Sequence, residues 1–230
     1  MVILMTDVEE LVKALELGSE SWWRKGKKSG DIRDELVSMG DKAVEALARV
    51  LKDKGQPPVA REGAAQVFES IMRKGTAEKI SQKSLEVMVD AVAAGLNDAN
   101  FTVYSTCERT LTGLAEYGLI GSLNPEFKEK TVKGLASIVF REDIAVLAVE
   151  GLNKIDYSDI SGGTRKQAID ALKRFVDKRA GGDDHFWAER AEELVKKIEK
   201  SSRRDVSAKP AKDMLEKSIE ERGKKKVKRF

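Results

Sequence analysis

The amino-acid sequence predicts an all-α protein, an α-solenoid of about four helical pairs with an N-terminal helical cap and a basic C-terminal arm. Residues that favour helices, above all Lys, Glu, Ala, Leu and Arg, are abundant, and proline occurs only four times in 230 residues. Apolar residues recur at the i, i+3, i+4 spacing that places them on one face of a helix. This pattern returns at intervals of roughly 40 residues, which is typical of stacked helical repeats.

We expect three regions along the chain. Residues 1–30 hold a first helix and a loop that is both basic and aromatic, residues 31–200 form the repeat solenoid, and residues 201–230 hold a linker, a short helix and a basic tail. Thr6 and Glu9 form the capping-box pattern of a helix start. Further expected helix boundaries are Asp31, Gly40, Asp53, Pro57–Pro58, Ser81, Gly118, Asn124–Pro125, Thr164, Gly181–Gly182 and Asp184.

The repeat is visible in both helices of each pair. The first helices carry apolar triplets whose starts are 45, 43 and 37 residues apart, namely Leu47/Val50/Leu51, Val92/Gly95/Leu96, Leu135/Ile138/Val139 and Leu172/Phe175/Val176. The second helices align at spacings of 44, 41 and 43 residues, with Val59, Val103, Ile144 and Trp187 at the first aligned position. The next aligned position is always small, as Gly63, Cys107, Ala148 and Ala191. We interpret these as packing positions, because a small residue at a fixed site lets two helices approach closely.

One stretch, GDKAVEALARVLKDKGQPPVAREGAAQVFESI at Gly40–Ile71, resembles a repeat of the HEAT family. Asp53 ends its first helix and the run Val59–Arg61 enters the second, as in the family pattern. Asp98 keeps part of the pattern in the next unit, although no arginine follows it in the corresponding place. The resemblance extends over about residues 31–198 and implies a binding scaffold rather than any particular activity.

Positive charge is concentrated at the C-terminus. Residues 195–230 contain 14 Lys/Arg and 6 Asp/Glu, a net charge of +8, whereas residues 1–194 contain 28 and 33, a net charge of −5. Clustered Lys and Arg neutralise phosphates and release counterions, so we interpret this arm as a nucleic-acid-binding segment in which Phe230 adds a stacking contact. The alternatives are a solubilising tail or one folded back on the acidic body. The candidate residues are Arg203, Arg204, Lys224, Lys225, Lys226, Lys228, Arg229 and Phe230.

A second candidate nucleic-acid contact lies near the N-terminus, where aromatic and basic residues alternate. Its residues are Trp22, Trp23, Arg24, Lys25, Lys27 and Lys28. A tryptophan here would serve as a stacking platform for RNA, with the lysines on phosphates. The alternative is that one tryptophan seals the end of the solenoid while the lysines stay hydrated.

Two weaker motifs favour structural roles. Trp187, near Asp183 and Asp184, invites comparison with HEAT-like DNA alkyl-base glycosylases, which use Trp, Asp and Arg, but its alignment with packing positions favours the core. ISGGTRK at Ile160–Lys166 places two glycines before a helix, yet it lacks the spacing of a phosphate-binding P-loop. We expect a turn there, with Thr164 as the helix cap.

The inventory of chemically active side chains is poor. The single cysteine, Cys107, excludes an intrachain disulfide and a Cys-based zinc site, and the single histidine supplies at most one imidazole ligand. Carboxylates are scattered, so no acid/base pair stands out. We therefore expect no catalytic residue, metal or cofactor. The apolar opening MVILM is too short for a signal peptide or a membrane span, which favours a cytoplasmic location.

The leading hypothesis is a non-enzymatic protein that engages nucleic acid or a ribonucleoprotein, such as the ribosome, through the basic arm. An acidic protein surface is the other partner that the arm suits. Two alternatives come from other classes: a protein–protein scaffold or regulatory subunit that binds through the repeat groove, and a DNA alkyl-base glycosylase. The net negative charge of residues 1–194 counts against the glycosylase, which requires a basic groove.

Overall fold

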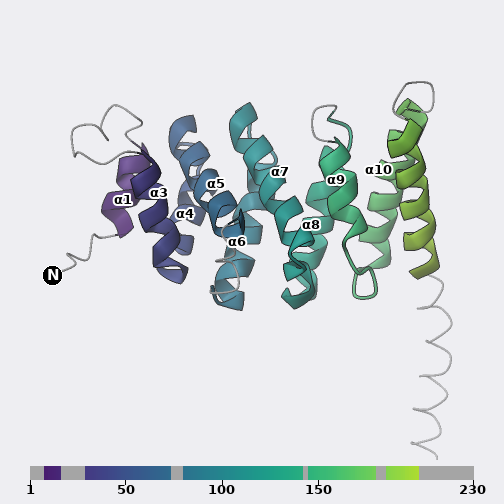
Figure 1. The fold of residues 1–230 in the computed structure, drawn as a ribbon, viewed down its shortest axis with the longest axis horizontal. Helices are drawn as coiled ribbons and strands as arrows, with labels where there is room; N and C mark the ends of the chain where they lie inside the picture. Colours follow the sequence, from purple (N-terminus) through teal and green to yellow (C-terminus); the bar gives the residue numbers. More distant parts are fainter. Residues whose placement is uncertain (1–7, 17–28, 74–79, 142–144, 180–184, 202–230) are drawn as a thin grey trace, which may run out of the picture.

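The computed structural model describes residues 8–16, 29–73, 80–141, 145–179 and 185–201, and these form a row of antiparallel helices (Figure 1). No β-strand occurs within these ranges, so the predicted all-α solenoid is confirmed. The elements are α1 (Val8–Glu16), α3 (Ser29–Met39), α4 (Asp41–Lys52), α5 (Pro58–Arg73), α6 (Gln82–Gly95), α7 (Phe101–Glu116), the short 3-10 helix η2 (Leu119–Ser122), α8 (Pro125–Ile138), α9 (Ala145–Asn153), α10 (Gly162–Arg179) and a terminal helix at 185–201.

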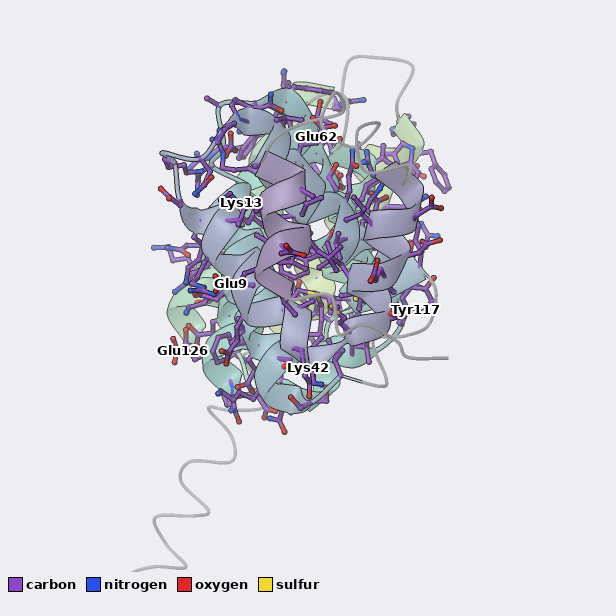
Figure 2. All side chains as sticks on the ribbon, turned by 90° about the vertical axis from the view of Figure 1, so that its left-hand side faces the viewer. Glu9, Lys13, Lys42, Glu62, Tyr117 and Glu126 are labelled. Carbon is purple, nitrogen blue, oxygen red and sulfur yellow. The ribbon has the colours of Figure 1, made fainter. Side chains whose placement is uncertain are left out.

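The helices form two layers. The first layer consists of α4, α6, α8 and α10, each packed on the next, and the second consists of α5, α7, α9 and the terminal helix. At the N-terminal end, α1 packs on α4 and α5 while α3 packs mainly on α5. The end-on view in Figure 2 places Glu126 of α8 and Tyr117, which follows α7, on opposite flanks, as two layers require. Because successive helices are antiparallel, all turns from a first-layer to a second-layer helix lie at one edge of the stack.

Several predicted helix boundaries are confirmed by the backbone. Gly40 (φ 55°) separates α3 from α4, and Gly118 (φ 70°) follows α7, both in the left-handed region that favours glycine. The Ser81 hydroxyl accepts a hydrogen bond from the backbone N–H of Ser84 at the start of α6. Pro125 occupies the first turn of α8.

The expected cap at Thr164 is wrong. Helix α10 begins at Gly162, and Ser161 acts as the cap because its hydroxyl accepts a hydrogen bond from the backbone N–H of Thr164 (3.3 Å). The two glycines are accommodated in the first helical turn, which moves the helix start upstream. The Thr164 hydroxyl donates instead to Oε2 of Glu129 (2.9 Å), and Glu129 Oε1 accepts from the backbone N–H of Ser161 (3.0 Å). A carboxylate of α8 thus already lies at this helix N-terminus.

The core follows the predicted periodicity. Every member of the first-helix triplets is buried except Val176, which is partly buried. Small residues allow close approach, as predicted: a Cβ at Gly63 would lie 3.1 Å from Leu15 Cδ2, and one at Gly95 would overlap the sulfur of Cys107. Within the described ranges, no helix combines the length and apolar character needed to cross a membrane.

The interpretation of Val59 as a packing residue is wrong, because its side chain is 46% exposed. Helix α5 begins at Pro58, so Val59 lies in the first turn on the outer side. The helical phase then directs Ala60, Ala64 and Val67 inward, and all three are fully buried.

Candidate functional site

The residues that the sequence singles out for nucleic-acid binding lie outside the described residues. This holds for the arm from Arg203 to Phe230 and for the loop from Trp22 to Lys28. Their assignment stays a prediction from the sequence. The described surface next to the arm is the C-terminal half of the terminal helix.

A groove of about 680 Å³ lies at this end of the solenoid. We call it the C-terminal basic groove, and its lining residues are Lys154, Ile155, Asp156, Tyr157, Glu193, Lys196, Lys197, Lys200 and Ser201. Four lysines face two carboxylates, and the groove ends at Ser201, next to the start of the arm. Lys154 follows α9, whereas the other lysines come from the terminal helix, so folding brings together charges that lie more than 40 residues apart in sequence.

The terminal helix presents these lysines because its other face is anchored in the core. Leu194, Val195 and Ile198 are buried, while Lys196 and Lys200 are exposed one helical turn apart. The i, i+4 spacing of these two lysines was visible in the sequence, but nothing there indicated that Lys154 joins them. None of these groove lysines was predicted from the sequence to form a site.

Lys197 has a structural role at this groove. Its ammonium donates a hydrogen bond to the backbone carbonyl of Asn153, the last residue of α9. Burial lowers the pKa of Lys197 from its usual value, while the carboxylate of Asp156 opposes that change. The lysine therefore satisfies a carbonyl at the end of α9 and ties that helix to the terminal helix.

A second groove, of about 520 Å³, continues the first along the terminal helix. It shares Lys154, Glu193 and Lys197 with the C-terminal basic groove and extends to Trp187 and Arg190. Its lining contains as many basic as acidic residues. The lining residues are Glu116, Val149, Glu150, Asn153, Lys154, Trp187, Arg190, Glu193, Leu194 and Lys197. Trp187 is partly buried against the core, so it serves packing and groove lining together.

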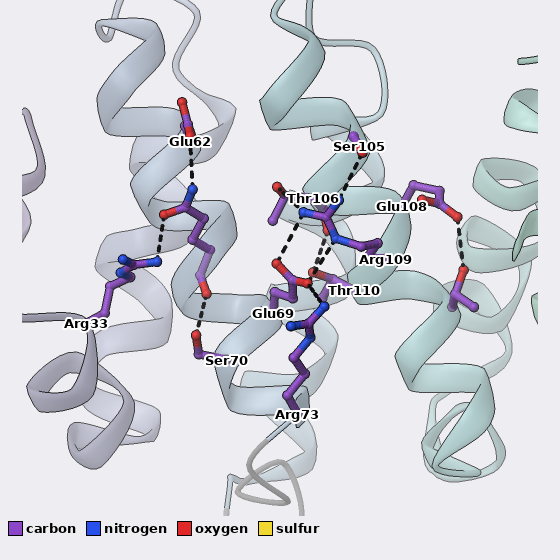
Figure 3. A network of polar contacts seen from close by, with 12 residues as sticks. Arg33, Glu62, Glu69, Ser70, Arg73, Ser105, Thr106, Glu108, Arg109 and Thr110 are labelled. Atoms are coloured by element: carbon purple, nitrogen blue, oxygen red, sulfur yellow. Dashed lines mark hydrogen bonds and ion pairs between the residues drawn. The ribbon is translucent and has the colours of Figure 1, made fainter. Parts of the chain in front are cut away.

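Charged side chains in the middle of the second layer are bonded to one another (Figure 3). Arg109 of α7 donates to Glu69 of α5 (Nε–Oε1 2.9 Å) and also to the hydroxyls of Ser105 and Thr106. Arg73 forms an ion pair with the same Glu69 (2.8 Å). This network joins α5 to α7, and it does not form the basic groove that the glycosylase hypothesis requires.

Two of the residues on which the HEAT-like resemblance rests, Arg61 and Asp98, lie in contact. They form a buried bidentate ion pair, with Nε–Oδ2 at 2.8 Å and Nη2–Oδ1 at 3.0 Å, that links α5 to the turn between α6 and α7. Burial alone would raise the pKa of Asp98, but hydrogen bonds from Arg61, the Asn100 backbone and Lys54 outweigh it and hold the pKa well below its usual value. The pair is an inter-repeat clamp.

The described residues offer little for catalysis. Cys107 is buried, and burial raises the pKa of its thiol to about 12, which suppresses the nucleophilic thiolate. The exposed His185 lies 3.5 Å from Glu189 of the same helix. Among the residues that the structure describes, no three His, Cys, Asp or Glu side chains come together as a metal site.

Comparison with known proteins finds similar folds but identifies no family. No family model matches this chain, and no curated protein matches it. Among solved structures, an engineered protein of the Northeast Structural Genomics Consortium is similar with a TM-score of 0.51 and 16% identity over 92% of this chain and 90% of that chain. A second engineered protein from the same consortium has a TM-score of 0.51 and 18% identity, over 82% of this chain and 47% of that chain.

A designed armadillo repeat protein is also found, with a TM-score of 0.33 and 12% identity over 83% of this chain and 91% of that chain. At these identities the two engineered proteins show the fold alone. The chain is a helical-repeat solenoid.

Proposed function

We propose that this chain is a non-enzymatic, HEAT-like scaffold protein of the cytoplasm that binds RNA, or a ribonucleoprotein such as the ribosome, through its basic C-terminal arm. The observation that supports this most is the C-terminal basic groove, whose four lysines lie where the chain passes into the arm. The groove places positive charge on the folded body next to the residue at which the arm begins, so a phosphate backbone bound by the arm can also contact the groove.

The first layer of helices supports the same proposal, because several of its lysines already have carboxylate partners. Three of its lysines are paired with carboxylates of neighbouring helices: Lys52 and Lys130 both bind Asp90 (3.0 and 2.7 Å), and Lys83 binds Glu45 (3.2 Å). A phosphate that bound there would have to displace a carboxylate. Binding to a polyanion is therefore favoured at the C-terminal end.

The Arg61–Asp98 clamp supports the HEAT-like assignment, since it joins the two positions at which the sequence follows the repeat pattern. The absence of an activated nucleophile or metal cluster in the described ranges gives no support to an enzymatic role. For the same reason, and because the second-layer groove is charge-balanced, we do not propose the glycosylase activity.

The experiment is fluorescence polarisation of a labelled single-stranded oligo-uridylate with the full chain across a salt series. Deletion of residues 202–230 should lower the affinity by about 100-fold or more at low salt, because most phosphate contacts are lost. Lys196→Glu with Lys200→Glu should weaken binding and reduce the salt slope by about 0.7 for each phosphate contact removed.

The matched control is Lys13→Glu with Lys42→Glu, which changes the net charge equally at the opposite end of the stack and should leave RNA affinity nearly unchanged. Unchanged affinity after the deletion would overturn the proposal. Equal losses in the control and in the Lys196/Lys200 variant would also overturn it, because total charge rather than the groove would then govern binding.

A further inference from the structure

Large apolar side chains that are exposed on the described surface follow a pattern. They are Val59, Phe101, Tyr117, Phe140 and Phe186. All except Tyr117 lie at the connection from a first-layer to a second-layer helix, one in each of four successive pairs: Val59 and Phe101 in the first turns of α5 and α7, Phe140 after α8, and Phe186 at the start of the terminal helix. We call Val59, Phe101, Phe140 and Phe186 the turn-edge row.

Aromatic and guanidinium groups are stacked along the middle of this row. The Phe101 and Tyr104 rings meet edge to face, with centroids 5.0 Å apart, and the guanidinium carbon of Arg141 lies 3.9 Å from the Tyr104 centroid. Phe101 is 58% exposed, so one side of this stack is open. Exposed rings of this kind mark interaction surfaces more often than isolated exposed aliphatic residues do.

Two more arginines lie over rings of the row. Arg174 of α10 lies 5.9 Å from the Phe140 centroid, and Arg190 lies 5.6 Å from the Phe186 centroid. Within the described ranges neither of them, nor Arg141, has a carboxylate partner, in contrast to the paired lysines of the first layer. A guanidinium stacked on a ring keeps N–H donors at its edge for an incoming carboxylate.

We propose that the turn-edge row is the docking surface for an extended, acidic segment of a partner protein. Neighbouring packed helices are about 8–10 Å apart, and a chain extended in the polyproline II conformation advances about 3.1 Å per residue with three residues per turn. Every third residue of such a segment therefore lies on the same face and meets the next member of the row, so a segment of about 12 residues spans all four repeats. Its apolar side chains contact the row, and its carboxylates meet the arginines.

A nucleic acid fits this surface less well than a peptide. Successive stacked bases are about 3.4 Å apart along a strand, so rings placed once per repeat do not receive consecutive bases. Val59 has no ring on which a base can stack. The row also lies at the opposite edge from the C-terminal basic groove, so this inference does not depend on RNA binding by the arm.

The test is selection from a display library of random 12-residue peptides on the immobilised full chain, with counter-selection on a Phe101→Ser, Phe140→Ser double variant. Enriched peptides should contain more Asp and Glu than Lys and Arg, with apolar residues at every third position. Their affinity, measured by fluorescence polarisation, should fall by about tenfold or more in the double variant, since exposed aromatic anchors dominate such interfaces.

Circular dichroism should show unchanged helical content for the variant, with an unfolding temperature lowered by only about a few degrees, because Phe101 and Phe140 are both outside the buried core. A second variant, Arg141→Gln with Arg174→Gln, leaves the apolar row intact. It should lower the affinity for the enriched peptides and make that affinity less dependent on salt concentration. Tyr117→Ser, at an equally exposed aromatic outside the row, and deletion of residues 202–230 should both leave peptide affinity unchanged. No enrichment over the double variant, enrichment of basic peptides, or loss of oligo-uridylate binding in the double variant would overturn the proposal.

Discussion

The first and last junctions of the solenoid use positive charge differently. Between the α4/α5 and α6/α7 pairs, the guanidinium of Arg61 is buried against the carboxylate of Asp98. Between α9 and the terminal helix, the ammonium of Lys197 is bound by the backbone carbonyl of Asn153. A carboxylate neutralises its partner, whereas a carbonyl accepts the hydrogen bond and leaves the positive charge in place.

This difference decides how much of the positive charge at each junction is cancelled. Carboxylates of neighbouring repeats cancel the cations of the first junction, so these cations contribute to architecture. At the last junction, Lys197 is bound by a carbonyl, which does not cancel its charge. The comparison teaches that the acceptor type, and not the number of lysines, decides whether the charge of a bonded cation is cancelled.

The largest expected effect is at the first junction. Asp98→Ala leaves the Arg61 guanidinium buried without its carboxylate and should lower the free energy of unfolding by about 3–5 kcal/mol. Asp90→Ala is the matched control, because Asp90 also bridges two cations but at a partly exposed site, and it should cost about 1 kcal/mol or less. Urea denaturation of the three proteins measures both changes. Equal losses in the two variants would contradict the distinction between buried and exposed pairs.

The second prediction concerns how the free energy of unfolding depends on pH. The pKa of Asp98 is lowered in the folded state, so its contribution to stability is fully present above its unfolded pKa of about 3.9 and is lost as pH falls below that value. The stability of the wild type should fall by up to about 1.4 kcal/mol per pH unit from this group. Urea denaturation between neutral pH and acid should show a flatter dependence for Asp98→Ala. An identical slope in the two proteins would rule out this clamp as a source of acid sensitivity.

The smallest effect is expected at the last junction. Lys197→Met removes the hydrogen bond to the Asn153 carbonyl and should cost about 1 kcal/mol, while Lys200→Met, at an exposed position with no such bond among the described residues, should be neutral. Differential scanning calorimetry of the two variants measures the difference. If Lys200→Met proved the more destabilising change, the division between a structural and an available lysine would be wrong.

Much of the fold was predictable because its signals are local. The i, i+3, i+4 triplets identified buried helix faces, and Gly40, Ser81 and Gly118 marked helix ends by conformational and capping preferences that depend on nearby residues. The two local errors, at Thr164 and Val59, both concern the first turn of a helix. There, a shift in the start of the helix decides which side chain caps and which side chain faces outward.

The candidate site was only partly predictable. The excess of positive charge at the C-terminus is a property of composition, and the sequence alone established it. Lys154, by contrast, joins the groove because α9 ends beside the terminal helix, and the turn-edge row forms because four connections align at one edge. Both depend on contacts between residues tens of positions apart.

By itself, the sequence determined that this chain is a helical-repeat solenoid, where most of its helices begin and end, and that its C-terminal arm is basic. Only the tertiary structure decided which charges are cancelled. Arg61 and Asp98 are 37 residues apart and become a clamp because stacking places α5 against the turn before α7, whereas Lys197 is bound by the backbone carbonyl of Asn153, which does not cancel its charge. Helix formation depends on short-range preferences, but neutralisation depends on which acceptor the packing of repeats brings within hydrogen-bonding distance.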